Sequence, residues 1–146
     1  MPLTIPIRTP PAHVEHGIQI GTERVLTVDD RALEQTLRAR IKGEVRFSDG
    51  DRALYSTDAS NYRMLPIGVV LPRDMDDVIE TVALCRQHGA PIFARGGGTG
   101  IPGQTTNDGV LLDFSKYMHR VLHIDPARRL ARVQPGCVLD SLNKEA

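Results

Sequence analysis

Only two cysteines, Cys85 and Cys137, occur among the 146 residues of this chain. Disulfide frameworks and cysteine-based metal sites need more cysteines than this, at recognisable spacings. Cys85 lies in a segment with helical periodicity, and Cys137 directly follows Pro135 and Gly136. We therefore expect two free structural thiols, rather than a redox pair or a covalent attachment point for a cofactor.

The chain also lacks net charge and long apolar runs. Its 18 Lys and Arg residues balance 18 Asp and Glu residues, so no electrostatic attraction to nucleic acid or to an anionic membrane is expected. No apolar stretch approaches the ~20 residues that span a bilayer. The first residues lack the basic start and apolar core of a secretion signal. We expect a cytoplasmic protein without a transmembrane segment, and any membrane association would be peripheral.

The chain does contain alternating helical and strand-like segments, with 40% hydrophobic and 25% charged residues, which is enough for a core. An irregular, proline-rich arm is expected up to about Thr27. Two helices are expected to begin at Asp29 or Asp30 and among Asp74 to Asp77, where carboxylates suit a helix N-terminus. Their expected buried residues are Leu33, Leu37 and Ile41 in the first helix, ended by Gly43, and Val78, Val82 and Cys85 in the second, ended by Gly89.

Strand-like segments make up much of the remainder. They cover residues 45–47, 67–71, 91–94, 110–114, 120–124 and 130–134, with a turn of helix at 51–55 and a further helix from Val138. The segment from Asp125 to Arg129 has the composition of a hairpin turn. The sequence therefore predicts an α+β fold with a small mixed sheet and flanking helices. Because no capping signal precedes Ala146, we expect this chain to be a truncated piece of a larger domain.

The most informative motif is the glycine-rich run from Arg95 to Gly100, which lies between two strand-like segments. Glycines let the backbone approach a ligand closely, so successive N–H groups can converge on phosphate oxygens. A flexible linker is a weaker interpretation, because linkers are not usually enclosed by strongly β-prone segments. The run predicts a diphosphate-binding loop.

Two familiar phosphate loops do not fit this run. A Walker A loop ends in Gly-Lys-Ser/Thr, whereas Gly103 is followed by Gln104. Gly98, Gly100 and Gly103 match the spacing of the dinucleotide fingerprint, but that motif must open a helix. Residues 104–109 are too few and too poor in helix formers for a crossover helix. A nicotinamide-binding fold is therefore not expected.

Several ordered motifs together resemble one known family. They are Pro66–Pro72, Asp77-Val78, the run from Pro91 to Gly100, Gly103-Gln104, Asp113–Ser115 with Met118, and Val133–Gly136. This pattern resembles the FAD-linked oxidases of the p-cresol methylhydroxylase and vanillyl-alcohol oxidase type, nearest the D-lactate and D-2-hydroxyglutarate dehydrogenases. The resemblance implies that residues 45–146 are the first half of an FAD-binding domain of this type (PCMH-type), preceded by an arm and helix over residues 1–44.

The resemblance also implies a set of cofactor-binding residues. They are Arg95, Gly96, Gly97, Gly98, Thr99, Gly100, Gly103 and Gln104. Thr99 stands where some family members carry a histidine that binds flavin covalently, which implies non-covalent FAD here. Gly100 replaces a serine that many relatives carry, which removes one hydroxyl donor. Arg95 has two interpretations: it neutralises the diphosphate, or it braces the loop by pairing with a carboxylate such as Asp113.

His119 and His123 have the i, i+4 spacing of a helical metal site. If residues 120–124 form a strand, these two histidines lie about 13 Å apart at roughly 3.3 Å per residue and cannot share one ion. No metal site is expected in this chain. Any iron–sulfur cluster, which related enzymes often carry downstream, would need ligands beyond residue 146.

The implied activity is oxidation of a D-2-hydroxy acid, such as D-lactate or D-2-hydroxyglutarate, by hydride transfer to FAD. This activity needs a small-molecule substrate and an electron acceptor. The resemblance implies that the substrate-binding arginines, any metal-binding histidines and the catalytic base come from later segments. No catalytic residue is therefore assigned here, and this piece alone is expected to be inactive. The alternative is a non-catalytic nucleotide-binding module that retains only the phosphate loop.

Overall fold

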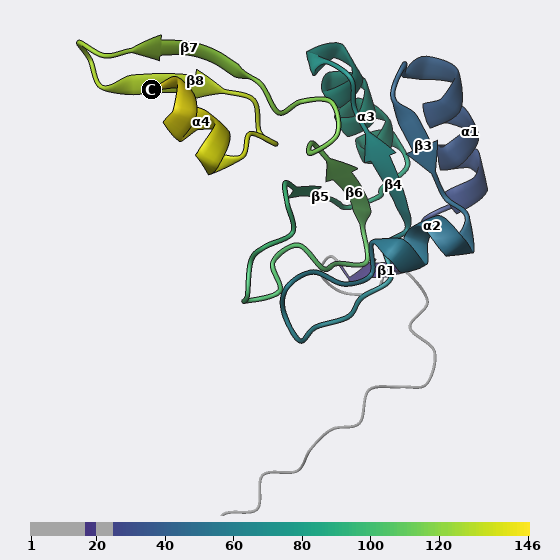
Figure 1. Cartoon of the computed structure of the whole chain (residues 1–146). Coiled ribbons are helices and arrows are strands. Elements are labelled where there is room, and N and C mark those ends of the chain that lie inside the picture. The colour runs from purple at the N-terminus through teal and green to yellow at the C-terminus, as the bar shows by residue number, and fades with distance from the viewer. Residues whose placement is uncertain (1–16, 20–24) are drawn as a thin grey trace, which may run out of the picture.

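A four-stranded mixed sheet forms the centre of the computed structural model, which describes residues 17–19 and 25–146 (Figure 1). Its strands are β3 (Glu44–Arg46), β4 (Gly68–Leu71), β5 (Ile92–Arg95) and β6 (Val110–Asp113). They lie in the order β3-β4-β6-β5, with β3 antiparallel to β4 and the other pairs parallel. The predicted α+β fold with a small mixed sheet is confirmed.

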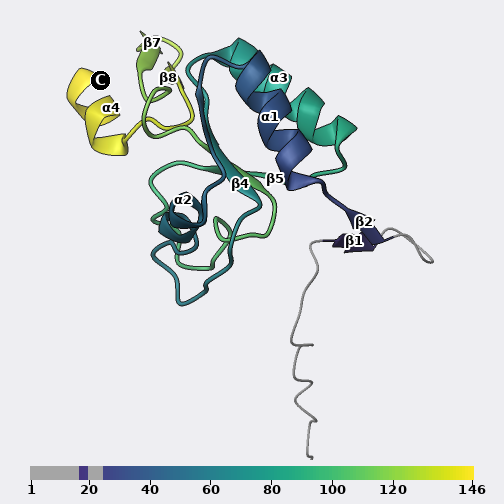
Figure 2. The ribbon, with the colours of Figure 1, turned by 90° about the vertical axis from the view of Figure 1, so that its right-hand side faces the viewer.

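Two helices, α1 (Asp30–Arg40) and α3 (Met75–Gln87), lie side by side against one face of this sheet (Figures 1 and 2). As predicted, Asp29 caps α1, accepting a hydrogen bond from Ala32 N at 3.0 Å. The core under the helices includes Leu33, Leu37, Val70, Leu84, Val110 and Leu112, all buried. α1, which precedes the predicted boundary at residue 45, thus shares the core of the sheet.

The opposite face of the sheet has a smaller apolar cluster. Val69, Leu71 and Leu111 point away from the helices because successive residues of a strand face opposite sides. They pack against Tyr55, Phe93 and Tyr117. Tyr55 follows the short helix α2 (Asp49–Leu54), which is capped by Ser48. This second cluster attaches the segment after α2 and the turn after β6 to the same face of the sheet.

The buried side of α3 differs from the prediction at one position. Val82 is 41% exposed, whereas Asp77, Thr81, Leu84 and Cys85 are buried. The reason is that the Asp77 carboxylate accepts hydrogen bonds from the backbone N–H groups of Lys42 at 2.8 Å and Arg73 at 2.9 Å. Because two amides hold this charged group, the side of α3 that carries Asp77 faces the protein, and the side that carries Val82 faces solvent.

Gly43 and Gly89 have different roles. Gly89 has φ +68° and ends α3 as predicted. α1 already ends before Gly43, with Ile41 as its C-cap. A side chain at Gly43 would lie 3.1 Å from Pro72 Cα and close to the Leu71 carbonyl, so this glycine permits close backbone packing. The prediction that Gly43 ends the helix is therefore wrong.

The connection between β5 and β6 determines where the glycine run lies. These strands are parallel neighbours, so residues 96–109 must return from the end of one strand to the start of the other. No helix forms within this fully described connection. The glycine run is therefore part of a crossover loop, which confirms the prediction that no helix follows the run.

Two hairpins lie outside the main sheet. β7 (Val121–Asp125) and β8 (Leu130–Val133) pair antiparallel, and with α4 (Leu139–Glu145) they stand apart from the four-stranded sheet (Figures 1 and 2). The predicted turn is confirmed by a 3.0 Å hydrogen bond from Arg128 N to Asp125 Oδ1.

The second hairpin is formed by β1 (Gly17–Gln19) and β2 (Val25–Thr27). These two strands correct the expectation of an irregular arm for the residues that they contain. The remainder of that predicted arm, residues 1–16 and 20–24, lies outside the described residues.

Candidate functional site

The glycine run begins at the end of β5 and leaves several backbone donors free. Gly98 has φ +65°, a conformation that favours glycine. Within the described part of the chain, the N–H groups of Gly97, Gly98 and Thr99 donate to no protein acceptor. Consecutive free N–H groups in a loop with one left-handed residue are the elements of an anion-binding nest.

A cavity of about 590 Å³ lies beside this run. One wall consists of Gly96, Gly97 and Thr99. The other side is formed by Ser115, His119 and residues 135–141, which lead into α4. The cavity thus lies between the glycine run, the turn after β6 and the segment after β8.

Arg95 packs against the glycine run from beneath. Its Nη1 donates to the Thr57 carbonyl at 2.8 Å, and its Cζ lies 5.6 Å from the centre of the Tyr55 ring. A Cβ atom added to Gly98 would lie only 2.7 Å from Arg95 Cζ. Of the two predicted roles, bracing the loop agrees with this geometry, but the partners are a carbonyl and an aromatic ring instead of Asp113.

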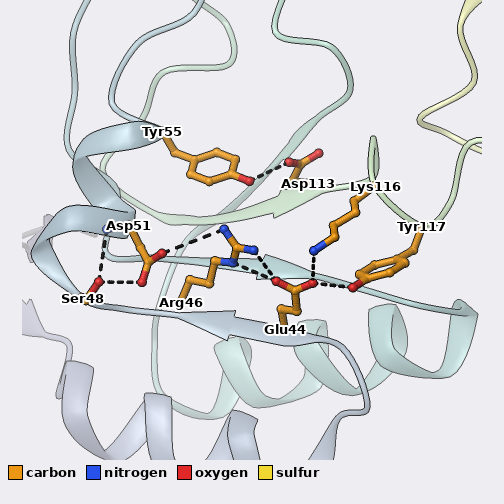
Figure 3. A network of polar contacts seen from close by, with 8 residues as sticks. All are labelled: Glu44, Arg46, Ser48, Asp51, Tyr55, Asp113, Lys116 and Tyr117. Atoms are coloured by element: carbon orange, nitrogen blue, oxygen red, sulfur yellow. Dashed lines mark hydrogen bonds and ion pairs between the residues drawn. The ribbon is translucent and has the colours of Figure 1, made fainter.

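Asp113, at the end of β6, has different partners and is 5% exposed. Its Oδ2 accepts a hydrogen bond from Tyr55 Oη at 3.0 Å, shown in Figure 3, and its Oδ1 accepts one from Ser115 N at 2.8 Å. Burial, followed by the charge of Asp113, raises the pKa of Tyr55, so its phenol stays protonated as a donor. Asp113 therefore connects Tyr55 to the turn that forms the far wall of the cavity.

A second set of contacts holds the same turn to β3 (Figure 3). Glu44 accepts hydrogen bonds from Lys116 Nζ and Tyr117 Oη, and from Arg46 Nε at 2.9 Å. These bonds, with that from Lys116 the strongest, lower the pKa of Glu44 to about 2. Glu44 thus remains ionised over the whole physiological pH range, and it holds the turn after β6 against β3.

The crossover loop is tied to Asp58 and Ala59, both near its start and near its far end. Thr105 Oγ1 donates to Asp58 Oδ2 at 2.6 Å, and Ala59 N donates to the Gly98 carbonyl at 2.9 Å. Hydrogen bonds from Ser60 and then Thr105 lower the pKa of Asp58 to about 2. The loop is therefore anchored at both ends.

A smaller cavity of about 250 Å³ lies near the far end of the loop. Gly103, with φ +81°, packs against the ring of Tyr62, and both residues line the cavity. The space above Gly100 is filled by Gln104, whose Cδ would lie 2.8 Å from an added Cβ. Gln104 therefore packs on the loop itself.

The eight predicted cofactor residues occupy three different positions. Gly96, Gly97 and Thr99 line the larger cavity and Gly103 lines the smaller one. The other predicted residues, Arg95, Gly98, Gly100 and Gln104, are among the lining residues of neither cavity in the described structure. They shape the loop from within.

Sequence reasoning did not identify the other wall of the larger cavity. Ser115 and His119 lie there because β6 ends beside β5, a pairing that no local motif reveals. His119 Nδ1 lies 3.0 Å from the Ser115 carbonyl oxygen, whereas His123 lies on β7. Among the described residues, no three His, Cys, Asp or Glu side chains gather as a metal site would require.

The two cysteines are free, as predicted. Cys85 is buried in the core, and this burial raises the pKa of its thiol to about 11. Cys137 is partly exposed and lines the larger cavity. Across residues 17–19 and 25–146, none of the helices has the length and apolar character needed to cross a bilayer.

Comparison with known proteins identifies relatives of this arrangement. Residues 66–146 match the family described as FAD binding domain. The chain is 38% identical over 115 residues to D-2-hydroxyglutarate dehydrogenase of Escherichia coli, covering 77% of this chain and 11% of that protein. It is 36% identical over 104 residues to glycolate oxidase subunit GlcD of Bacillus subtilis, covering 68% of this chain and 22% of that protein.

The fold is also that of a solved structure. The crystal structure of p-cresol methylhydroxylase with substrate bound superposes with a TM-score of 0.62 at 20% identity, over 79% of this chain and 24% of that one. The chain spans only about a tenth of the length of the D-2-hydroxyglutarate dehydrogenases that it matches.

Proposed function

Because this chain belongs to the FAD-binding domain family of FAD-linked oxidoreductases, we propose that the larger cavity holds the diphosphate of FAD. The observation that carries the proposal is the set of N–H groups of Gly97, Gly98 and Thr99 beside that cavity, which find no acceptor among the described residues. Hydrogen bonds from amides to a diphosphate are charge-assisted and stronger than bonds between neutral groups.

The residues around the cavity suit such a ligand. A Cβ added to Gly97 would meet only Thr99 Cγ2, at 3.5 Å, so this glycine keeps ligand space open. The Thr99 hydroxyl and the His119 imidazole supply further polar groups to the cavity. Threonine has no nucleophilic ring nitrogen, so we propose non-covalent FAD.

We place the flavin end of the cofactor toward Gly103 and Gln104, two residues that the family resemblance assigns to cofactor binding. The smaller cavity supports this direction, because Tyr62, Met64 and Pro102 give it apolar walls suited to a flat ring. Once bound, FAD supplies the hydride-accepting chemistry of the reaction. The residues of this chain bind and orient it.

The proposed substrate is a D-2-hydroxy acid. Support comes from the matched D-2-hydroxyglutarate dehydrogenase, whose name specifies such a substrate, together with a glycolate oxidase subunit whose name specifies another 2-hydroxy acid. We assign no catalytic residue to the described residues. An electron acceptor is required, because the reduced cofactor must be reoxidised.

Titration of the isotope-labelled chain with FAD, ADP and riboflavin tests the cofactor site. FAD and ADP carry the diphosphate and riboflavin does not, so the amide signals of Gly96 to Thr99 should shift with the first two ligands only. Equal shifts with riboflavin, or no shift with any of the three, would contradict a diphosphate site at this loop.

The substrate is tested separately on the complete flavin-loaded protein that carries this chain. Anaerobic addition of D-2-hydroxyglutarate or D-lactate should bleach the oxidised flavin spectrum, whereas the L-enantiomers should not. A protein that binds FAD but is reduced by none of these acids would instead support the alternative, a non-catalytic nucleotide-binding module.

A further inference from the structure

The side chain of Arg95 lies behind the glycine run, outside the larger cavity. Gly98 is buried directly against it, with room for no side chain between the two residues. Gly96, Gly97 and Thr99 line the cavity, but among the described lining residues neither Arg95 nor Gly98 is present. The guanidinium is therefore placed to support the loop, on a different side from the proposed diphosphate.

The guanidinium is held by groups that precede the loop in sequence. The Thr57 carbonyl accepts from Nη1 at 2.8 Å, and the Tyr55 ring lies under Cζ at 5.6 Å. A planar guanidinium can stack on an aromatic face while donating at its edge, which a lysine ammonium cannot do in the same way. These contacts fix the orientation of Arg95 without any ligand.

Tyr55 carries the connection further. Its hydroxyl donates to Asp113 Oδ2 at 3.0 Å, and Asp113 Oδ1 accepts from Ser115 N at 2.8 Å. Ser115 lines the cavity opposite Gly96 and Gly97. One continuous chain of contacts therefore joins the two walls.

We propose that Arg95 is a positioning residue, and that Arg95, Tyr55 and Asp113 form a relay that sets the spacing between the glycine run and the Ser115 turn. Its relevance to cofactor binding rests on the proposed function, because the spacing matters only if an anion binds between these walls. The relay differs from direct neutralisation of the diphosphate by Arg95.

The relay is tested in the ligand-free chain by amide hydrogen exchange. Ala59 N donates to the Gly98 carbonyl and Ser115 N to Asp113, so these two amides report on the two walls. Arg95→Gln should accelerate exchange at Ala59 about tenfold, since a charge-assisted support is lost. Arg132→Gln, which removes an exposed arginine on β8, is the matched control and should change neither amide.

Tyr55→Phe separates the two halves of the relay. The ring remains beneath Arg95, so exchange at Ala59 should stay within about twofold of the wild type, while Ser115 loses the fixed position of its acceptor and should exchange about tenfold faster. This variant removes a single oxygen atom and keeps the test available even if Arg95→Gln does not fold. Slow exchange of Val69 and Val70 in β4 verifies an intact sheet.

The affinities of the Arg95→Gln and Arg95→Lys variants for ADP complete the test. We expect about a tenfold loss for Arg95→Gln and only partial recovery for Arg95→Lys, which keeps the charge but not the planar group. A loss of affinity in Arg95→Gln without faster exchange at Ala59, or full recovery in Arg95→Lys, would show a direct ligand and overturn the relay. Unchanged exchange at Ser115 in Tyr55→Phe would also overturn it.

These outcomes are distinct from failure of the proposed function. A wild-type chain that binds neither ADP nor FAD contradicts the cofactor site, whereas the exchange measurements need no ligand.

Discussion

Gly97 and Gly98 are adjacent in the chain, yet a side chain at Gly97 would point into open space beside Thr99, whereas one at Gly98 would collide with Arg95. The two positions therefore separate binding from stability. Gly97→Leu should fill the cavity and abolish ADP and FAD binding, while the free energy of unfolding changes by less than about 0.5 kcal/mol.

Gly98→Ala is the matched variant for that comparison. Alanine at φ +65° is strained and would displace Arg95, so we expect a loss of about 1–3 kcal/mol in the free energy of unfolding. Urea denaturation measures both variants. Equal destabilisation by the two substitutions would disprove this assignment of their roles.

His119 and His123 offer a second comparison on the opposite wall. His119 lines the larger cavity, and His123 lies on β7 outside its lining among the described residues. His119→Ala should weaken ADP binding about three- to tenfold, the equivalent of one modest hydrogen bond. His123→Ala should leave the dissociation constant unchanged. Calorimetric titration decides between them, and equal effects would show that neither imidazole acts locally.

Acid stability should depend on Glu44. Its pKa is about 2 in the folded protein against an ordinary value of 4.5, so the stabilisation is fully present above pH 4.5 and is lost as the pH falls toward 2. Glu44→Gln should therefore lower the free energy of unfolding at pH 7 and flatten its decline between pH 5 and 2. Urea unfolding across this range measures the effect. A parallel decline in both proteins would mean that other carboxylates dominate.

Asp77 should matter more to stability than its neighbour Asp76. Asp77 is 2% exposed and its carboxylate accepts two backbone hydrogen bonds, whereas Asp76 is exposed. Asp77→Ala should cost about 3 kcal/mol, because two backbone amides lose a charged acceptor. Asp76→Ala should cost less than about 0.5 kcal/mol. Thermal unfolding of the two variants provides the comparison, and similar melting temperatures would be inconsistent with this role.

Local signals predicted much of the fold. Asp29 and Asp74 were recognisable as helix caps, and the hairpin turn after Asp125 was recognisable from its composition. In each case the determining contact lies within a few residues of the signal, as in the 3.0 Å bond from Asp77 N to Asp74 Oδ1. The glycine run was also predicted correctly as a loop without a following helix.

Features determined by distant contacts were not predictable in this way. Asp77 is buried because it meets the amide of Lys42 across 35 residues, and an amphipathic pattern treats any aspartate as exposed. The Arg95 side chain finds Thr57 rather than Asp113 because the 55–57 segment packs on that face of the sheet. Ser115 and His119 reach the cavity only through the pairing of β5 with β6.

The crossover loop from β5 to β6 limits which changes of sequence can alter ligand binding. The segment 96–109 both borders the ligand cavity and delivers the chain to β6, where Val110 and Leu111 are fully buried. Because this loop is also tied to the preceding segment at Gly98 and Thr105, one residue added or removed would break these hydrogen bonds, so loop length is coupled to the fold. New ligand preferences should therefore arise here by substitution, whereas insertions are better tolerated at the β7–β8 turn.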